Sequence, residues 1–305
     1  MRDYLHGEAY DDATGRPLAG ATVMLYPSDA SLPGAVEPPD PPLYQSFTDE
    51  RGRYTMTGEV TAGRYVIVIE QQGFTRAVRR MALEPATGFV PFDARLTPLA
   101  APAGTLKPIT GATLTTADAS VTFDAEAVPG SDPLNVTITP LSGQGLPDFL
   151  PLGWTPVAAA ELLLADPATG TELPETTSFA ADAVHLTLPL PSRITVDDEL
   201  YAIRYHLAAG TWQTAADIEL LDTADGPAAR IELDPAKRRE LTEIATEMTG
   251  SGKTIGSSVA GFFGSASVWP VRVFFMPSSA TISPACADSR SSREFACIST
   301  IRPMR

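Results

Sequence analysis

The chain has 305 residues, 44% of them hydrophobic and 19% charged, so it is long enough for two ordinary domains with sizeable apolar cores. Its 28 prolines and 23 glycines suit a chain of many short strands joined by turns. The net charge of −15 repels phosphate backbones and anionic lipid, which excludes nucleic acid as an expected partner.

Strand-like segments follow one another along the first part of the sequence, and residues 1–12 show no secretory signal, since they lack a basic start followed by an apolar run. The predicted strands are 4–10, 21–26, 44–48, 54–60, 64–74, 76–85 and 89–99. In the fifth of these, Tyr65, Ile67 and Ile69 fall on one face. Val66 and Val68 fall on the other face. A strand that is apolar on both faces is predicted to be central in its sheet.

Turn-forming residues separate these strands. Gly15 and Gly20 surround Pro17 in the first turn, and Gly52 is placed to adopt a positive φ between two strands. Residues 27–43 are rich in proline and are expected to form an extended surface loop. Residues 1–98 are therefore predicted to form one β-sandwich domain.

The second half of the chain repeats this β-rich pattern after a segment rich in Pro, Ala, Gly and Thr. That segment, 99–112, is interpreted as a linker between domains. Residues 113–235 are predicted to form a second sandwich. Its expected strands are 120–128, 134–141, 158–167, 183–191, 198–208, 211–220 and 229–235.

The C-terminal region departs from this pattern. Residues 236–275 are expected to hold an amphipathic helix, a Gly/Ser segment and a last strand, with Asp234 as the helix N-cap and Pro235 at the first helical position. Residues 254–271 carry no charge, but their serines, glycines and proline favour a flexible segment over a membrane span. The tail 276–305 is expected to be disordered.

Both cysteines, Cys286 and Cys297, lie in this tail, and whether they pair is left open. A bridge between them would close only a short loop. With no third or fourth ligand nearby, they do not indicate a metal site.

The first segment resembles the carboxypeptidase regulatory-like family. The motifs that carry this resemblance are GEAYDDATGRPLAGATVMLY, FTDERGRYTM and AGRYVIVIEQQGF, and they span residues 4–98. The resemblance implies a small antiparallel β-sandwich of the transthyretin-like type.

The second half resembles a β-rich module of large bacterial surface proteins of the rearrangement-hotspot (RHS) or teneurin-like type, and more distantly the ZU-type domains. The motifs are LNVTITPLSGQGLPDFLPLGWTPVAAAELL, VHLTLPLP and LYAIRYHLAAGTW. Some ZU-type domains cleave themselves at a His-Phe-Ser site, and that tripeptide does not occur in this chain.

The sequence predicts no active site, cofactor or metal. His6, His185 and His206 lie far apart in predicted strands, and none has a Glu three residues later as a zinc carboxypeptidase would need. The GSGKT stretch at 250–254 lacks the earlier glycine of a phosphate-binding loop, because Glu247 stands there.

Three further sequence features favour a structural role over a binding role. The acidic pair Asp49 and Glu50 is interpreted as a solvated turn rather than a calcium site. The acidic run at 197–199 is interpreted in the same way. The Asn135 glycosylation motif lies inside a predicted strand and is discounted.

The fold class expected is therefore mainly β, with two antiparallel β-sandwich domains and one amphipathic helix near the C-terminus. The expected function is a non-enzymatic structural, adhesion or scaffold segment of a bacterial cell-surface or secreted protein. One alternative is a carbohydrate-binding module, for which Trp154 and Trp212 are the candidates for sugar stacking. The other is the N-terminal part of an RHS-type toxin or delivery protein. The partner is left open between a glycan and another surface protein, without membrane insertion.

Overall fold

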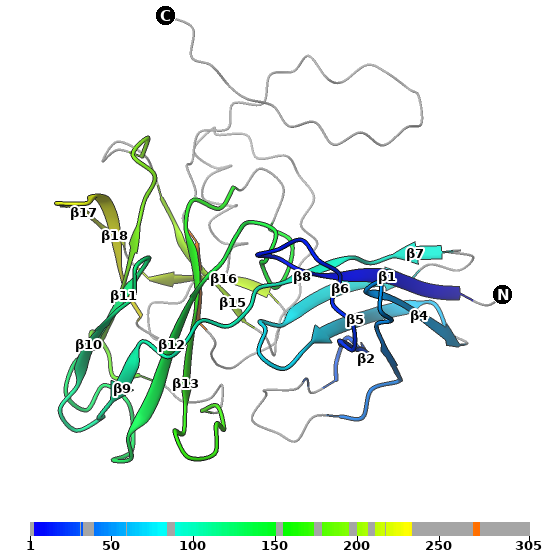
Figure 1. The fold of residues 1–305 in the computed structure, drawn as a ribbon, viewed down its shortest axis with the longest axis horizontal. Coiled ribbons are helices and arrows are strands. Elements are labelled where there is room, and N and C mark those ends of the chain that lie inside the picture. The colour runs from blue at the N-terminus through cyan, green and yellow to red at the C-terminus, as the bar shows by residue number, and fades with distance from the viewer. Residues whose placement is uncertain are drawn as a thin grey trace, which may run out of the picture.

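The structure is a computed structural model in which strands account for all the regular secondary structure of the described residues (Figure 1). The described residues are 3–30, 32, 40–58, 60–83, 89–150, 155–173, 179–194, 200–206, 211–216, 218–233 and 271–274. The mainly-β prediction is confirmed over these residues. The predicted helix, the tail and nearly all of the uncharged segment 254–271 lie outside them.

The first half of the chain forms two sheets that pack on a shared core. One sheet holds β1 (Asp3–Asp11), β4 (Arg53–Gly58), β7 (Phe89–Pro91) and β8 (Ala94–Leu96). The other has the order β3-β2-β5-β6, from β2 (Thr22–Pro27), β3 (Tyr44–Phe47), β5 (Gly63–Glu70) and β6 (Ala77–Leu83). Alternate residues of each sheet point inward, so Leu5 and Tyr54 meet Val23, Ile67 and Ile69 in one buried cluster.

The first strand departs from the predicted antiparallel arrangement. β1 pairs antiparallel with β4 but parallel with both β7 and β8. The chain leaves β6 in one sheet, crosses to the other sheet and then runs alongside β1 in the same direction. Sequence periodicity reports which residues face the core, and it carries no information about the direction of the neighbouring strand.

The three predicted turn glycines all adopt a positive φ, 68° at Gly15, 79° at Gly20 and 74° at Gly52. The side chain of Asp49 organises the second turn by accepting the amide N–H groups of Arg51 and Arg53, each at 2.8 Å. These hydrogen bonds lower the pKa of the Asp49 carboxyl, since they favour its charged form. Gly52 and Gly15 differ in the space around them. A Cβ on Gly52 would lie 2.5 Å from the carbonyl oxygen of Ala9, whereas a Cβ on Gly15 would have nothing within 4 Å.

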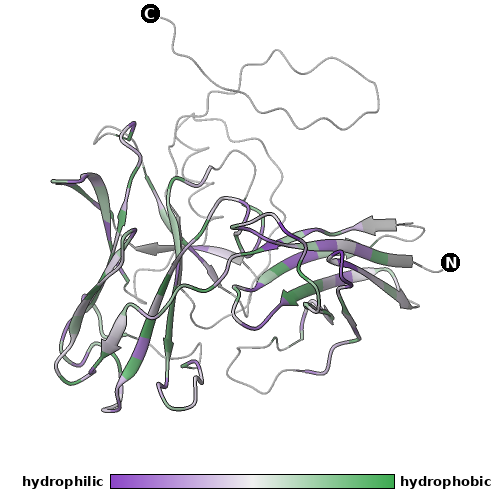
Figure 2. Cartoon of the chain, in the orientation of Figure 1, coloured by the Kyte–Doolittle hydropathy of each residue, from purple (hydrophilic) through white to green (hydrophobic). Residues whose placement is uncertain are grey.

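The second half also forms two sheets on a shared core. One has the order β10-β11-β14-β18-β17, from β10 (Ala112–Thr115), β11 (Ser120–Phe123), β14 (Val184–Pro189), β17 (Ile218–Thr223) and β18 (Gly226–Glu232). The other has the order β16-β15-β19-β13-β12-β9, from β9 (Gly104–Leu106), β12 (Leu134–Pro140), β13 (Ala159–Ala165), β15 (Ala202–His206), β16 (Thr211–Ala216) and β19 (Val271–Phe274). Figure 2 shows polar and apolar residues mixed along these strands, and β14 alternates between buried and partly buried positions.

Two segments of the second half differ from the sequence-based expectation. The linker predicted at 99–112 contains β9, whose Leu106 is fully buried and pairs with Leu134. The single strand predicted at 211–220 is two strands, because β16 and β17 belong to different sheets. In both cases a short strand obtains its stability from its tertiary partners, so its own residues give little sign of it.

We predict that Gly52→Ala destabilises the fold much more than Gly15→Ala. Each substitution places an alanine in the left-handed region at a cost of about 1 kcal/mol. Only the alanine at position 52 also overlaps backbone atoms. We therefore expect Gly52→Ala to lower the free energy of unfolding by about 3 kcal/mol in total. Urea unfolding of the two variants measures the difference. Equal losses of stability would contradict the crowding of the 49–53 turn.

Candidate functional site

The two halves of the chain meet on a common apolar core, which we call the junction core. Its members are at most 8% exposed and come from both halves: Met24, Tyr26, Leu32, Val66, Val68 and Val78 from the first, and Leu146, Ala159, Ile203, Tyr205 and Trp212 from the second. The strands β2, β5 and β6 present Met24, Tyr26, Val66, Val68 and Val78 on the face opposite their own sandwich core. The apolar alternation of Val66 and Val68 is thus explained by the second half, which covers this face.

A loop of the second half, residues 141–150, which we call the junction loop, lies against β6 and fills the space between the halves. The amide of Val78 donates a hydrogen bond of 2.7 Å to the carbonyl of Pro147. The side chain of Leu146 is buried in the junction core. At Gly145 the loop approaches the first half so closely that a Cβ there would lie 2.8 Å from a carboxylate oxygen of Asp12. A larger residue at position 145 would therefore require the side chains of Thr97 and Asp12 to move.

Arg79 of β6 holds the junction loop by its guanidinium, although it is only 4% exposed. Its Nη1 donates hydrogen bonds to the carbonyls of Pro147 and of Leu146, the latter at 3.1 Å. The guanidinium carbon also lies 4.6 Å from the ring centroid of Phe149. Arg79 therefore satisfies loop carbonyls that would otherwise be buried, and it stacks on the loop's exposed aromatic ring.

Two aromatic residues of the second half bind the same loop from the opposite side. The hydroxyl of Tyr205 donates to Oδ2 of Asp148 at 3.2 Å, and the indole Nε1 of Trp212 donates to the Phe149 carbonyl at 2.9 Å. The Tyr205 and Trp212 rings pack edge to face, with centroids 5.0 Å apart. Trp212, a candidate for sugar stacking, is thus 7% exposed and part of the junction core, and Trp154 lies outside the described residues.

The charges at the junction alter two acid–base equilibria. Removal from water raises the pKa of the Asp148 carboxyl to about 6, and the positive charge of Arg79 opposes that shift. Burial, with the nearby Asp148 carboxylate as a second cause, raises the pKa of the Tyr205 hydroxyl.

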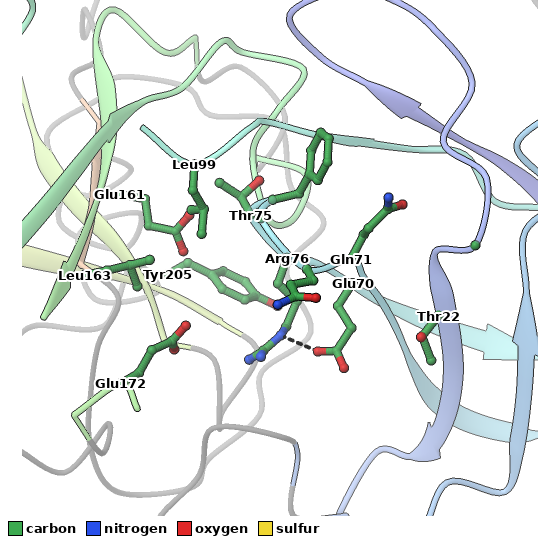
Figure 3. Close-up of a pocket in the computed structure, with 14 residues that line it drawn as sticks. Thr22, Glu70, Gln71, Thr75, Arg76, Leu99, Glu161, Leu163, Glu172 and Tyr205 are labelled. Atoms are coloured by element: carbon green, nitrogen blue, oxygen red, sulfur yellow. Dashed lines mark hydrogen bonds and ion pairs between the residues drawn. The ribbon is translucent and has the colours of Figure 1, made fainter. Parts of the chain in front are cut away.

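A pocket of about 500 Å³ opens beside the junction core (Figure 3). The turn between β5 and β6 forms one wall, where Glu70 and Arg76 make an ion pair of 2.9 Å. Glu161 of β13 and Tyr205 of β15 belong to the opposite wall, from the second half. The pocket therefore lies between the halves, and one of its lining residues, Tyr205, also belongs to the junction core.

The histidines singled out in the sequence are not brought together. His6 lies on β1, His185 on β14 and His206 on β15. Among the described residues no three His, Cys, Asp or Glu side chains gather as a metal site would require. The described part of the chain also contains no helix of the length and apolarity needed to span a membrane.

The residues of the junction have only faint signals in the sequence. The apolar run on both faces of β5 predicts a covered strand but leaves the covering element unknown. Charged residues in otherwise apolar strands are a second signal, as with Arg79 and Arg80 in AVRRMAL and Glu161 in AAELLLA. The junction loop itself contains two glycines, a proline and a serine, which are typical of a solvent-exposed connection.

We predict that Arg79→Met lowers the free energy of unfolding by about 3 kcal/mol, because the loop carbonyls lose their buried donor. Arg53→Met is the matched control. Arg53 makes a 2.9 Å ion pair with Glu8, but its side chain is 59% exposed. Loss of this exposed ion pair should lower the free energy of unfolding by less than about 1 kcal/mol. Chemical denaturation of both variants tests this, and a loss at Arg79 no larger than at Arg53 would contradict the role of its guanidinium.

No protein-family model matches this chain, and a search of curated proteins finds no significant relative. Solved structures that resemble it include enzymes and a pilin. It is 18% identical to 3-chlorocatechol 1,2-dioxygenase from Rhodococcus opacus 1CP, over 32% of this chain and 60% of that one, with a TM-score of 0.23. It is 23% identical to 5-hydroxyisourate hydrolase from Klebsiella pneumoniae, over 32% of this chain and 85% of that one, also with a TM-score of 0.23.

The third comparison covers more of the chain. BcpA, the major pilin subunit of Bacillus cereus, is 11% identical over 76% of this chain and 54% of the pilin, with a TM-score of 0.25. The chain thus spans less than two thirds of both the dioxygenase and the pilin. With TM-scores this low, the function of the chain has to be inferred from its own residues.

Proposed function

We propose that this chain is a non-enzymatic structural segment, a rigid spacer or scaffold, of a bacterial cell-surface or secreted protein. The observation that carries the proposal is the junction core. Val66 and Val68 of the first half are fully buried there, as is Ile203 of the second half. Two β-rich units joined through such a core keep one mutual orientation, as a spacer under load requires.

The polar contacts of the junction support the same role. The Val78 amide and the Arg79 guanidinium of the first half both donate to carbonyls of the junction loop. Trp212 of the second half donates to the carbonyl of Phe149 in the same loop. Because buried hydrogen bonds are directional, they restrict sliding of the halves in a way that an apolar contact alone would not.

The surface or secreted location is proposed from the resemblance of residues 4–98 to the carboxypeptidase regulatory-like family. Antibody labelling of intact cells that produce the native protein tests this location. We expect labelling without permeabilisation, and labelling that requires permeabilised cells would contradict the proposed location.

We predict that the two halves unfold together in one calorimetric transition. Val68→Asp should split this transition in two, because a carboxylate in the junction core is buried without compensation and uncouples the halves. Thr57→Asp, on an exposed position of β4, is the control and should keep a single transition. Two separate transitions in the unsubstituted chain would contradict the rigid-segment proposal.

A further inference from the structure

The pocket between the two halves has the size and the position of a small-molecule site. Its volume of about 500 Å³ lies within the range of roughly 300 to 1,000 Å³ that is typical of such sites. Thr22 of β2 and the β5–β6 turn line it from the first half, and residues of β13 and β15 line it from the second. Boundaries between structural units are a preferred place for ligand pockets. The structural role proposed above gives this space no task.

One strand of the second half directs a carboxylate toward this pocket. In β13, Ala160 and Leu162 belong to the core of the second half. The alternate residues face the junction, where Ala159 is in the junction core and Leu163 lines the pocket. Glu161 lies between these two on the same face, lines the pocket and is only 3% exposed. Because a buried wall has a lower dielectric constant than water, a carboxylate there attracts a cation more strongly than one on the open surface.

The charges around the pocket favour a positive ligand. Three glutamates and one arginine line it, and the arginine, Arg76, is in an ion pair with Glu70. Figure 3 shows Glu161 and Glu172 on one side of the pocket and Glu70 on the other. Among the described residues no three His, Cys, Asp or Glu side chains gather to hold a metal ion. The expected ligand is therefore an organic cation rather than a bare metal ion.

Apolar side chains supply contacts for the carbon part of such a ligand. Phe74 and Leu99 line the pocket itself. Phe47 of β3 lies beside it, because Thr22 pairs with Phe47 on one side and with Glu70 on the other, and directly paired residues share a face of the sheet. Phe47 is 61% exposed, so its ring is open to a ligand that extends out of the pocket.

We propose that this pocket binds an alkylammonium group, with Glu161 and Glu172 accepting hydrogen bonds from the ammonium and the apolar wall contacting the alkyl chain. The site adds a binding role to the proposed structural one and does not depend on it. Ammonium groups of this kind are carried by small free amines and by the side chain of lysine.

The test is an NMR titration of the full chain with n-butylammonium, butan-1-ol and butyrate, which share an alkyl chain and differ in the charge of the head group. The amides of Thr75 and Leu99, two residues that line the pocket, report binding. We expect n-butylammonium to bind with a Kd on the order of 1 mM, butan-1-ol at least about tenfold more weakly and butyrate not at all. No binding of n-butylammonium, or equal binding of the alcohol, would overturn the proposal.

Substitution of the two carboxylates separates the site from general attraction to an acidic surface. Glu161→Gln should weaken n-butylammonium binding about tenfold, and Glu172→Gln, at an exposed position, about threefold. Glu50→Gln is the matched control, since Glu50 is exposed and does not line the pocket, and it should leave the Kd unchanged. Should Glu161→Gln not fold, the exposed Glu172→Gln still tests the site. An unchanged Kd in Glu172→Gln, or an equal loss in Glu50→Gln, would overturn it.

The exposed ring of Phe47 gives the site a second, independent readout. 2-Phenylethylammonium should bind about threefold more tightly than n-butylammonium, because its ring can pack on Phe47 outside the pocket. Phe47→Ser should remove this gain. Ile109→Ser is the control, since Ile109 is 59% exposed but does not line the pocket, and it should keep the gain. A gain that survives in Phe47→Ser would contradict the place of Phe47 at the site.

A blocked tripeptide with lysine at its centre and glycine on either side distinguishes the two sources of the ammonium group. Binding as tight as that of n-butylammonium would support a lysine of a protein partner as the ligand, and binding of n-butylammonium alone would support a free amine. Failure of both would overturn the proposal. These titrations are read on the folded chain, so they can fail or succeed whatever the number of calorimetric transitions, which tests the rigid-segment proposal.

Discussion

The sheet that contains β5 has to be covered on both of its faces, and the rest of the molecule follows from this constraint. Ile67 and Ile69 point into the core of the first half, while Val66 and Val68 point the other way, and all four are fully buried. An isolated first half would expose the second set to water, at a cost of about 1.5 to 3 kcal/mol for each large apolar side chain. The second half removes that cost, so the two halves behave as one unit around a shared sheet.

The junction loop performs a second task, which is to close the edge of that sheet. β6 is the last strand of the order β3-β2-β5-β6, and an uncovered edge strand offers unpaired backbone groups to other chains. Here the Val78 amide donates a hydrogen bond to the carbonyl of Pro147. The guanidinium of Arg79 then satisfies further loop carbonyls, which a proline-containing loop cannot pair as a regular strand would. A buried arginine thus replaces a strand partner at this edge.

Local sequence patterns predicted much of the secondary structure and little of the junction. Strands and turns obey local rules, so the alternation in β14 and the positive φ at Gly52 could be foreseen from neighbouring residues. The parallel pairing of β1, the strand β9 and the separation of β16 from β17 depend on partners distant in sequence. The same is true of the candidate site. Trp212 is a strand residue in the sequence, and only its packing on Tyr205 and its bond to Phe149 make it part of the junction.

By itself the sequence determined that this chain is built of short strands, that residues 64–74 hold a strand buried on both faces, and that turns fall at Gly15 and Gly52. These properties depend on residues adjacent in the chain, whose periodicity and φ preferences act locally. Tertiary structure alone decided what covers β5 and which loop closes β6. Hydrogen bonds and apolar contacts between residues some 70 positions apart, such as Arg79 and Leu146 with a separation of 67, exist only when the chain has folded, so no local pattern encodes them.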